Sequence, residues 1–250
     1  MKNCLQLTFD SGQTALAIRA DRQAELPDAL KQIGLGSSRS VLVVVGGASN
    51  ISEADFLRIK RLFTEVLAPI AESLGAYVVD GGTDAGVMKL MGEARTQIGA
   101  KFALIGVTPE NKVALPNQQQ SGADSTPLEP NHTHFVLVPG DNWGDESPWI
   151  SRVATVLANN APSMTVLLNG GEITFEDAFS SVNTGRLVVA IAGSGRTADI
   201  LADALRGEAT DERAKKLAKS GILQYVNLID IEKGVNNLGK IIKDLLSNEE

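Results

Sequence analysis

The stretch YVVDGGTDAGVMKLMGEA, residues 77–94, carries the fold signal of this chain. It begins as an apolar run, passes through Gly81 and Gly82, and continues into an amphipathic helical pattern. Glycine tolerates positive φ and lets a ligand approach the backbone closely. Thr83 or Asp84 can cap the helix, and the open N–H groups at a helix N-terminus attract anions. The stretch therefore predicts a strand, a glycine turn and a helix, with an anion site at the turn.

The same arrangement occurs three more times. The apolar runs VLVVV (41–45), MTVLL (164–168) and LVVAIA (187–192) lead into the glycines Gly46/Gly47, Gly170/Gly171 and Gly193/Gly195. Unbroken apolar strands are typical of a parallel sheet that is buried on both faces. Right-handed crossovers then place all strand C-termini at one edge, where open α/β sheets bind ligands. We predict an α/β, Rossmann-like, doubly wound and mainly parallel sheet with helices on both faces.

One domain is expected over residues 1–250. We divide it into an N-terminal hairpin and short helix (1–39), the core (40–206) and a helix–strand–helix segment (207–250). Pro69 is expected to kink or split the long helix that precedes the opening stretch. The polar segment 110–130 is too long for a plain connection, so it is expected to form a surface lid or excursion.

The composition excludes several classes of protein. A formal net charge of −7 without a long basic run argues against a nucleic-acid surface. Cys4 is the one cysteine, so an intrachain disulfide is excluded and a reducing compartment fits. No secretory h-region and no apolar run of spanning length are present, so we expect a cytoplasmic protein with no membrane partner. A homo-oligomer through the long or the closing helix remains open.

The segment GSGRTA, residues 193–198, matches the dinucleotide pattern G-x-G-x-x-A after a strand. The acidic residue expected about twenty positions later is not obvious at a strand end, since Asp211 and Glu212 fall in a predicted helix. Arg196 adds a cation at a helix start. This combination favours phosphate binding over hydride transfer.

Other polar residues have competing interpretations. Arg152, in the first turn of a predicted helix, is either a solvated side chain or a bidentate phosphate clamp. His132 and His134 share a strand face, but they lie at its N-terminal end, so no metal site is expected. The acidic loop with Asp141, Asp145 and Glu146 is expected to be solvated, although it could hold a divalent ion.

Several motifs together resemble a known family. They are GGASN (46–50), DGGTDAGVMKLMGEA (80–94), NHTHFVLV (131–138), LLNGGEITFEDA (167–178) and GSGRTADILADAL (193–205). This set resembles the SLOG superfamily, and within it the prokaryotic TRPM-like (LSDAT) branch, over about residues 40–206. The resemblance implies a Rossmann-like domain that binds or senses an NAD-derived nucleotide, such as ADP-ribose or a cyclic ADP-ribose relative. No cofactor is required.

The resemblance also implies a set of ligand-binding residues. They are Gly46, Gly47, Asn50, Gly81, Gly82, Thr83, Val87, Arg152, Gly170, Gly171, Thr174, Gly193, Ser194, Gly195 and Arg196. Among these, Arg196 and Arg152 are expected to hold phosphate groups together with the glycine turns.

The chain also resembles, more distantly, the LOG phosphoribohydrolases, whose hallmark is PGGxGTxxE. The corresponding segment here is NGGEITFED, in which Asn169 replaces the proline, Ile173 the third glycine and Asp177 the glutamate. Cleavage of an N-glycosidic bond needs a carboxylate near the anomeric carbon or its attacking water. The alternative function is therefore a nucleotide N-glycosidase with Asp177 or Glu176 as the acidic group.

Overall fold

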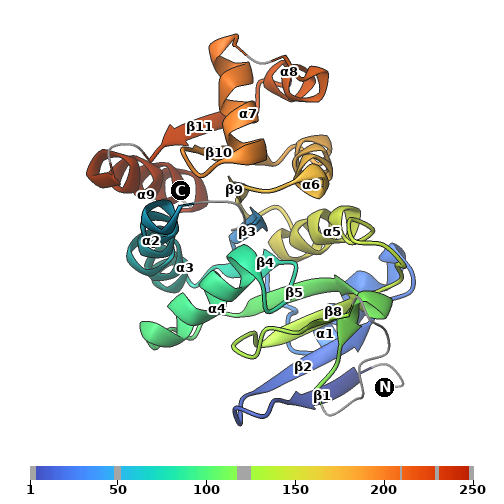
Figure 1. The fold of residues 1–250 in the computed structure, drawn as a ribbon. Coiled ribbons are helices and arrows are strands. Elements are labelled where there is room, and N and C mark those ends of the chain that lie inside the picture. The colour runs from blue at the N-terminus through green and yellow to red at the C-terminus, as the bar shows by residue number, and fades with distance from the viewer. Residues whose placement is uncertain (1–3, 48–51, 117–124, 209, 229–230, 248–250) are drawn as a thin grey trace.

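The computed structural model describes residues 4–47, 52–116, 125–208, 210–228 and 231–247 (Figure 1). Within these residues the strands of the central sheet are β1 (Cys4–Thr8), β2 (Thr14–Arg19), β3 (Val41–Gly46), β4 (Tyr77–Asp80), β5 (Leu104–Pro109), β8 (His134–Val138), β9 (Ser163–Leu168), β10 (Leu187–Ala192) and β11 (Leu223–Asn227). Their spatial order is β1-β2-β8-β5-β4-β3-β9-β10-β11. Only the β1–β2 pair is antiparallel among them. The predicted α/β, mainly parallel sheet is confirmed, and the N-terminal hairpin extends it at one edge.

Helices cover both faces of the sheet (Figure 1). The helices α1 (Leu26–Gln32), α5 (Ser147–Ala158), α6 (Glu172–Asn183), α7 (Arg196–Arg206) and α8 (Glu212–Ala218) contribute to one core cluster. The helices α2 (Glu53–Leu62), α3 (Ala68–Leu74), α4 (Gly86–Gln97) and α9 (Ile231–Leu246) lie on the opposite face. This two-sided cover explains why the inner strands read as unbroken apolar runs.

The alternation of side chains along β3 shows how the sheet joins its two cores. Val43 and Val45 belong to the cluster on the α5 side, whereas Leu42 and Val44 belong to the cluster on the α4 side. All four are 3% exposed or less. Burying each such side chain contributes about 1.5–3 kcal/mol relative to leaving it exposed. The strand at the centre of the domain is therefore fixed from both faces.

The helix expected over 52–74 is divided, as Pro69 predicts. Ser52 caps α2 by accepting the Asp55 N–H at 3.1 Å. A π-helical turn at Phe63–Leu67 then separates α2 from α3, in which Pro69 lies in the first turn. Proline lacks the N–H that a continuous helix would use. The wider π-helical turn immediately before Pro69 accommodates this missing hydrogen bond.

The side of the sheet on which successive strands are added changes at β3. After β3 it adds β4, β5 and β8 on one side, then returns to add β9, β10 and β11 on the other. Open parallel sheets bind ligands in the crevice that such a reversal leaves outside the strand C-termini. The neighbouring ends of β3, β4 and β9 therefore mark the candidate site.

The described parts of segment 110–130 form short strands and pack against the rest of the domain. Strands β6 (Val113–Ala114) and β7 (Thr126–Pro127) pair with each other. Val113, Leu115 and Leu128 are buried with Phe135 of β8 in a third core cluster. Residues 117–124 lie outside the described part. The segment thus covers the sheet near β8 and brings β7 towards the strand ends.

A search of the described residues finds no helix that is both long enough and apolar enough to cross a membrane.

Candidate functional site

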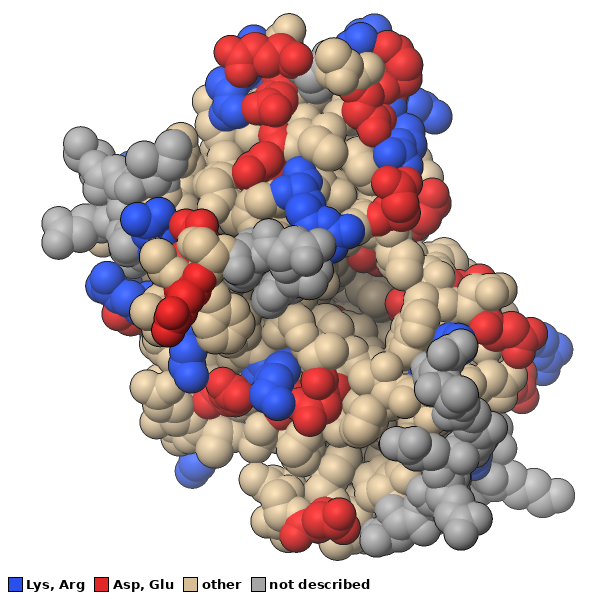
Figure 2. Space-filling view, in the orientation of Figure 1, with Lys and Arg blue, Asp and Glu red and all other residues tan. Residues whose placement is uncertain are grey.

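A cavity of about 490 Å³ lies at the carboxyl ends of β3, β4 and β9. Its lining residues are Val44, Val45, Gly46, Gly47, Gly81, Thr83, Ala85, Met88, Thr126, Trp143, Glu146, Ile150, Gly170, Gly171, Glu172, Ile173, Thr174, Asp177 and Arg196. Figure 2 shows this face of the molecule hollowed near its centre, with both basic and acidic side chains on the rim. The volume falls in the range of small-molecule sites, about 300–1,000 Å³.

Glycine is required at the floor of the cavity. Gly46 has φ +126°, and a Cβ at this position would lie 1.8 Å from the carbonyl oxygen of Leu168. Any side chain would therefore push β3 away from β9. The absence of side chains at Gly46 and Gly47 leaves backbone exposed to the cavity, which suits close approach of a ligand.

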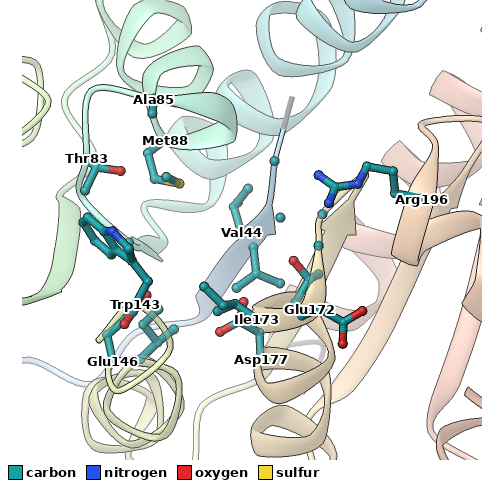
Figure 3. A pocket seen from close by; sticks show the side chains of 18 of the residues that line it. Val44, Thr83, Ala85, Met88, Trp143, Glu146, Glu172, Ile173, Asp177 and Arg196 are labelled. Atoms are coloured by element: carbon teal, nitrogen blue, oxygen red, sulfur yellow. The ribbon is translucent and has the colours of Figure 1, made fainter. Parts of the chain in front are cut away.

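Arg196 stands at one side of the cavity, as the first residue of α7 (Figure 3). Its backbone takes a left-handed φ of +52°. Its guanidinium crosses Gly171, because a Cβ built on that glycine would lie 2.8 Å from Arg196 Nη2. The glycine therefore makes room for the arginine, and the pair brings a positive charge to the backbone turn after β9.

The turn at residues 193–195 holds the turn after β9 in place through hydrogen bonds. Ser194 Oγ accepts the Asn169 N–H at 2.8 Å, and Asn169 Nδ2 donates to the Ser194 carbonyl at 2.8 Å. The Ala198 N–H donates to the Asn169 carbonyl, and the Gly193 N–H donates to Asp199 Oδ1. These amides are used inside the protein, so they are not donors for a ligand.

Two carboxyl side chains line the side of the cavity formed by α5 and α6. Glu146 is the residue immediately before α5 and Asp177 lies on α6, and each is only 8% exposed. Burial raises the pKa of Asp177 to about 7, the charges of Glu146 and Glu176 add to the rise, and Ser147 opposes it. Burial also raises the pKa of Glu146. Asp177 Oδ1 has no hydrogen-bond partner among the described residues.

A second group of acids is buried beside the cavity wall. His132 Nε2 lies 2.8 Å from Asp80 Oδ1, and His132 Nδ1 lies 2.8 Å from Glu129 Oε2. Burial alone would lower the pKa of His132, but the two carboxylates outweigh it and raise that pKa to about 9. Asp80 Oδ1 also accepts the Gly82 N–H at 2.8 Å. This cluster fixes the turn that carries Gly81 and Thr83 into the cavity wall.

The family of proteins described as SLOG in TRPM, prokaryote, matches residues 39–237 of this chain. That range contains the cavity and most of the sheet. The chain belongs to this family. The resemblance to the SLOG superfamily inferred from the motifs is thereby confirmed.

Several curated relatives of this SLOG domain are ion channels. It is 28% identical over 204 residues to transient receptor potential cation channel subfamily M member 2 of Mus musculus, which covers 68% of the chain and 13% of the channel. It is 25% identical over 273 residues to the member-like 2 protein of Nematostella vectensis, covering 88% of the chain and 17% of that protein. A match to member 6 of Mus musculus, 25% identical over 202 residues, covers 69% and 10%. The chain thus spans a small part of the length of these relatives.

The SLOG domain brings many of the predicted ligand-binding residues together. Gly46, Gly47, Gly81, Thr83, Gly170, Gly171, Thr174 and Arg196 all line the cavity, as does Asp177. Asn50 lies outside the described residues. The glycine turns after β3, β4 and β9 therefore converge, and the fourth turn contributes through Arg196.

Other predicted residues have structural surroundings instead. Val87 is fully buried in the core beneath α4. A Cβ on Gly82 would lie 2.8 Å from the Cα of Gly106, so this glycine allows two backbone segments to touch. Gly193, Ser194 and Gly195 do not line the cavity and form the supporting turn described above. Glu176 is exposed and is not part of the lining either.

Arg152 lies in a different groove. It is exposed, and it lines a polar groove of about 430 Å³ together with Lys31 of α1 and Ser37. The structure does not bring Arg152 to the glycine turns beside Arg196, and its exposure agrees with the other interpretation, a solvated side chain. The physical reason is the helical periodicity of α5, in which Ile150 and Val153 are buried while Arg152 points outwards.

Sequence reasoning missed Glu146, Trp143 and Thr126. The acidic loop follows the carboxyl end of β8, and the rule that selected the glycine turns also applies to that loop. The expectation of a solvated loop is wrong for Glu146, which is buried at the cavity. Thr126 reaches the cavity through the pairing of segment 110–130, for which the sequence carries no local signal.

The two histidines, His132 and His134, differ in their surroundings. No group of three or more His, Cys, Asp or Glu side chains that could hold a metal ion is found in the described part of the chain. His132 is fully buried between its two carboxylates and stacks on Phe135, with ring centroids 5.3 Å apart. His134 faces elsewhere and its Nδ1 lies 2.8 Å from Thr133 Oγ1. The two side chains therefore have separate surroundings.

Proposed function

We propose that this SLOG domain binds a nucleotide derived from NAD, such as ADP-ribose or a cyclic ADP-ribose relative. The phosphates would lie on the glycine turns at 46–47 and 170–171, beside the guanidinium of Arg196. The observation that supports this most directly is the placement of Arg196 across Gly171 at the edge of an open cavity. A guanidinium next to exposed backbone is a suitable partner for a phosphate, because it donates several hydrogen bonds and carries a fixed charge.

The opposite wall of the cavity suits the uncharged parts of a nucleotide. Trp143, Ile150 and Met88 provide apolar surface, and Figure 3 shows Trp143 and Met88 across the cavity from Arg196. An aromatic side chain offers a face on which a base can stack. The buried carboxyls that line the same cavity offer acceptors for ribose hydroxyls. The cavity thus has a basic side for the phosphates and an apolar side for the base.

Isothermal titration calorimetry with ADP-ribose, cyclic ADP-ribose, NAD and AMP tests this proposal. We expect saturable binding of at least one of these nucleotides, and mass spectrometry of the purified protein should find a related copurified compound. The absence of heat and of thermal stabilisation with all four would contradict the proposal.

Two arginine variants separate the cavity from the outer groove. Arg196→Ala should weaken nucleotide binding by about 1.5–3 kcal/mol, the contribution of a hydrogen bond to a charged group. Arg152→Ala is the matched control, because it removes the same side chain from a groove that the cavity does not include. Calorimetry should show its affinity unchanged. Equal losses for both variants would place the phosphate elsewhere.

A second candidate function is a nucleotide N-glycosidase, and the environment of Asp177 favours it. This carboxyl is buried at the cavity with its pKa raised to about 7 and with one oxygen lacking a hydrogen-bond partner among the described residues. General acids work best when their pKa lies near the working pH. The other predicted carboxyl, Glu176, is exposed outside the cavity lining. Release of free base that Asp177→Asn abolishes would support this activity.

A further inference from the structure

The strongest unassigned feature of the cavity is the second carboxyl, Glu146. It lies at the N-terminus of α5, whereas Asp177 comes from α6, and both side chains line the same cavity. Figure 3 shows Glu146 beneath Trp143, on the far side of the cavity from Arg196, with Asp177 between them. Two buried carboxyls from adjacent helices are costly unless a ligand or a shared proton compensates them.

The two carboxyls have unequal surroundings. Glu146 Oε2 accepts the Gly144 N–H at 2.7 Å, a hydrogen bond that stabilises its ionised form. Asp177 is more than nine-tenths buried, and its Oδ1 has no partner among the described residues. Burial raises the pKa of both groups, and for Asp177 it reaches about 7. The pair is therefore suited to a division of roles, because the hydrogen bond from Gly144 favours the ionised form of Glu146 and the burial of Asp177 favours its protonated form.

The charged groups around the pair leave this division in place. Glu176 and Glu172 lie on α6 itself, and Asp145 precedes Glu146. From α8, Arg213 faces α6 but pairs with Glu172 and Asp211. Arg196 of α7 lines the same cavity. The charges that act on Asp177 are those of Glu146 and Glu176, and both raise its pKa.

We infer that Glu146 and Asp177 act together as the general base and the general acid that hydrolyse the N-glycosidic bond of a bound purine nucleotide. Glu146 removes a proton from water as the water oxygen bonds to C1′ of the ribose. The bond between C1′ and the base nitrogen breaks, and Asp177 delivers its proton to that nitrogen. The products are free base and a ribose with a hydroxyl at C1′. The proton on Glu146 then returns to Asp177 through solvent.

The protonated state of Asp177 indicates the class of leaving group. A purine leaves as a neutral molecule only when it receives a proton, so an acid at this position accelerates its departure. A pyridinium base such as nicotinamide already leaves as a neutral molecule and gains little from a proton donor. The pair therefore favours adenine release from AMP or ADP-ribose over nicotinamide release from NAD. This inference rests on the proposed binding of a nucleotide in the cavity.

Base release measured by chromatography from AMP, ADP-ribose and NAD between pH 5 and 9 tests the pair. We expect adenine as the product and a bell-shaped pH profile, since one group must be ionised and the other protonated. Glu146→Gln should lower the rate by about 100-fold or more and remove the acidic limb of the profile. Asp177→Asn should remove the alkaline limb. Glu176→Gln, at an exposed residue of α6 outside the cavity lining, should keep the maximal rate and should only shift the alkaline limb to lower pH, because the charge of Glu176 helps to raise the pKa of Asp177.

The experiment distinguishes a loss of nucleotide binding from a loss of hydrolysis. Calorimetry on the same proteins shows whether Glu146→Gln and Asp177→Asn still bind ADP-ribose, and therefore whether they are folded. ADP-ribose binding without adenine release by the unmodified protein would overturn the acid–base pair and leave the binding proposal standing. Nicotinamide release without adenine release would overturn the assignment of Asp177 as acid. An unchanged rate in Glu146→Gln would overturn the role of Glu146, and absence of any binding would remove both proposals.

Discussion

Among the described residues of this domain, two clusters of buried acids differ in the groups that pair with their carboxyls. In the closed cluster, His132 sits between Asp80 and Glu129, and Asn131 and the backbone supply further donors to the carboxylates. Only Asp80 Oδ2 lacks a partner there among the described side chains. In the open pair, Glu146 and Asp177 face a cavity, and a carboxyl oxygen of Asp177 lacks a partner.

The difference indicates which cluster serves the fold and which is free for a ligand. A buried charge that is paired and hydrogen-bonded within the protein holds its neighbours in position. The closed cluster ties the end of β4 to the segment before β8. A buried acid without such partners costs stability, and that cost is tolerated most readily where a ligand or a reaction uses the group.

The largest effect is expected from His132→Ala. It leaves Asp80 and Glu129 buried without their shared cation, and breaking a buried ion pair from one side costs about 3–5 kcal/mol. Urea denaturation measures this loss in the free energy of unfolding. His134→Ala is the matched control, with an expected loss of about 1 kcal/mol for its contact with Thr133. Similar losses in both variants would show that the closed cluster contributes no special stability.

The two clusters should also titrate in separate ranges of pH. The pKa of Asp177 rises from 3.8 to about 7 on folding, so the native state holds its proton longer and stability falls between about pH 4 and 7. Asp177→Asn should remove that fall, which we expect to be roughly 4 kcal/mol for a shift of about three pKa units at about 1.4 kcal/mol each. The pKa of His132 rises from 6.5 to about 9 on folding. The stability that its positive charge contributes is therefore lost as the pH rises from about 6.5 to about 9.

Urea denaturation across pH 4–10 distinguishes the two ranges. The fall between pH 6.5 and 9 should persist in Asp177→Asn and disappear in His132→Ala. A variant that flattens both ranges at once would show that the clusters are coupled, and the distinction drawn between them would be lost.

The smallest effect on stability is expected from Gly171→Ala, at the open site. The added methyl group would lie 2.8 Å from Arg196 Nη2, the end of a flexible side chain that can move aside. We expect a loss of less than about 1 kcal/mol in unfolding free energy, as for an ordinary surface substitution. Nucleotide affinity, measured by calorimetry, should nevertheless fall about 10-fold because the guanidinium is displaced. A large loss of stability would assign Gly171 to the fold.

The sequence predicts the sheet and the convergence of three glycine turns, because both follow from local patterns. Apolar runs reveal buried strands, and the topology of a parallel sheet places their C-termini together. The role of Ser194 and its neighbours could not be read in this way. The Ser194 hydroxyl and carbonyl accept hydrogen bonds from Asn169 in the turn after β9, and that contact depends on how β9 and β10 pair.

The carboxyl pair was only half predictable. Asp177 matches a motif position, whereas Glu146 lies in a loop whose sequence, DNWGDE, resembles many solvated acidic loops. Its burial results from the packing of α5 against α6, which is a tertiary property. Arg152 shows the opposite case, since its place in the sequence fits a phosphate clamp while the rotation of α5 turns it away.

The reversal of the chain at β3 has a consequence for how the domain can be divided. Gly46 and Thr83 come from the half of the sheet built first, and Gly171 and Arg196 come from the half built second. A protease cut between β8 and β9 that let the halves separate would leave each fragment with one wall and no enclosed space. A ligand bound in the cavity contacts both halves of the sheet, so it should slow their separation after such a cut.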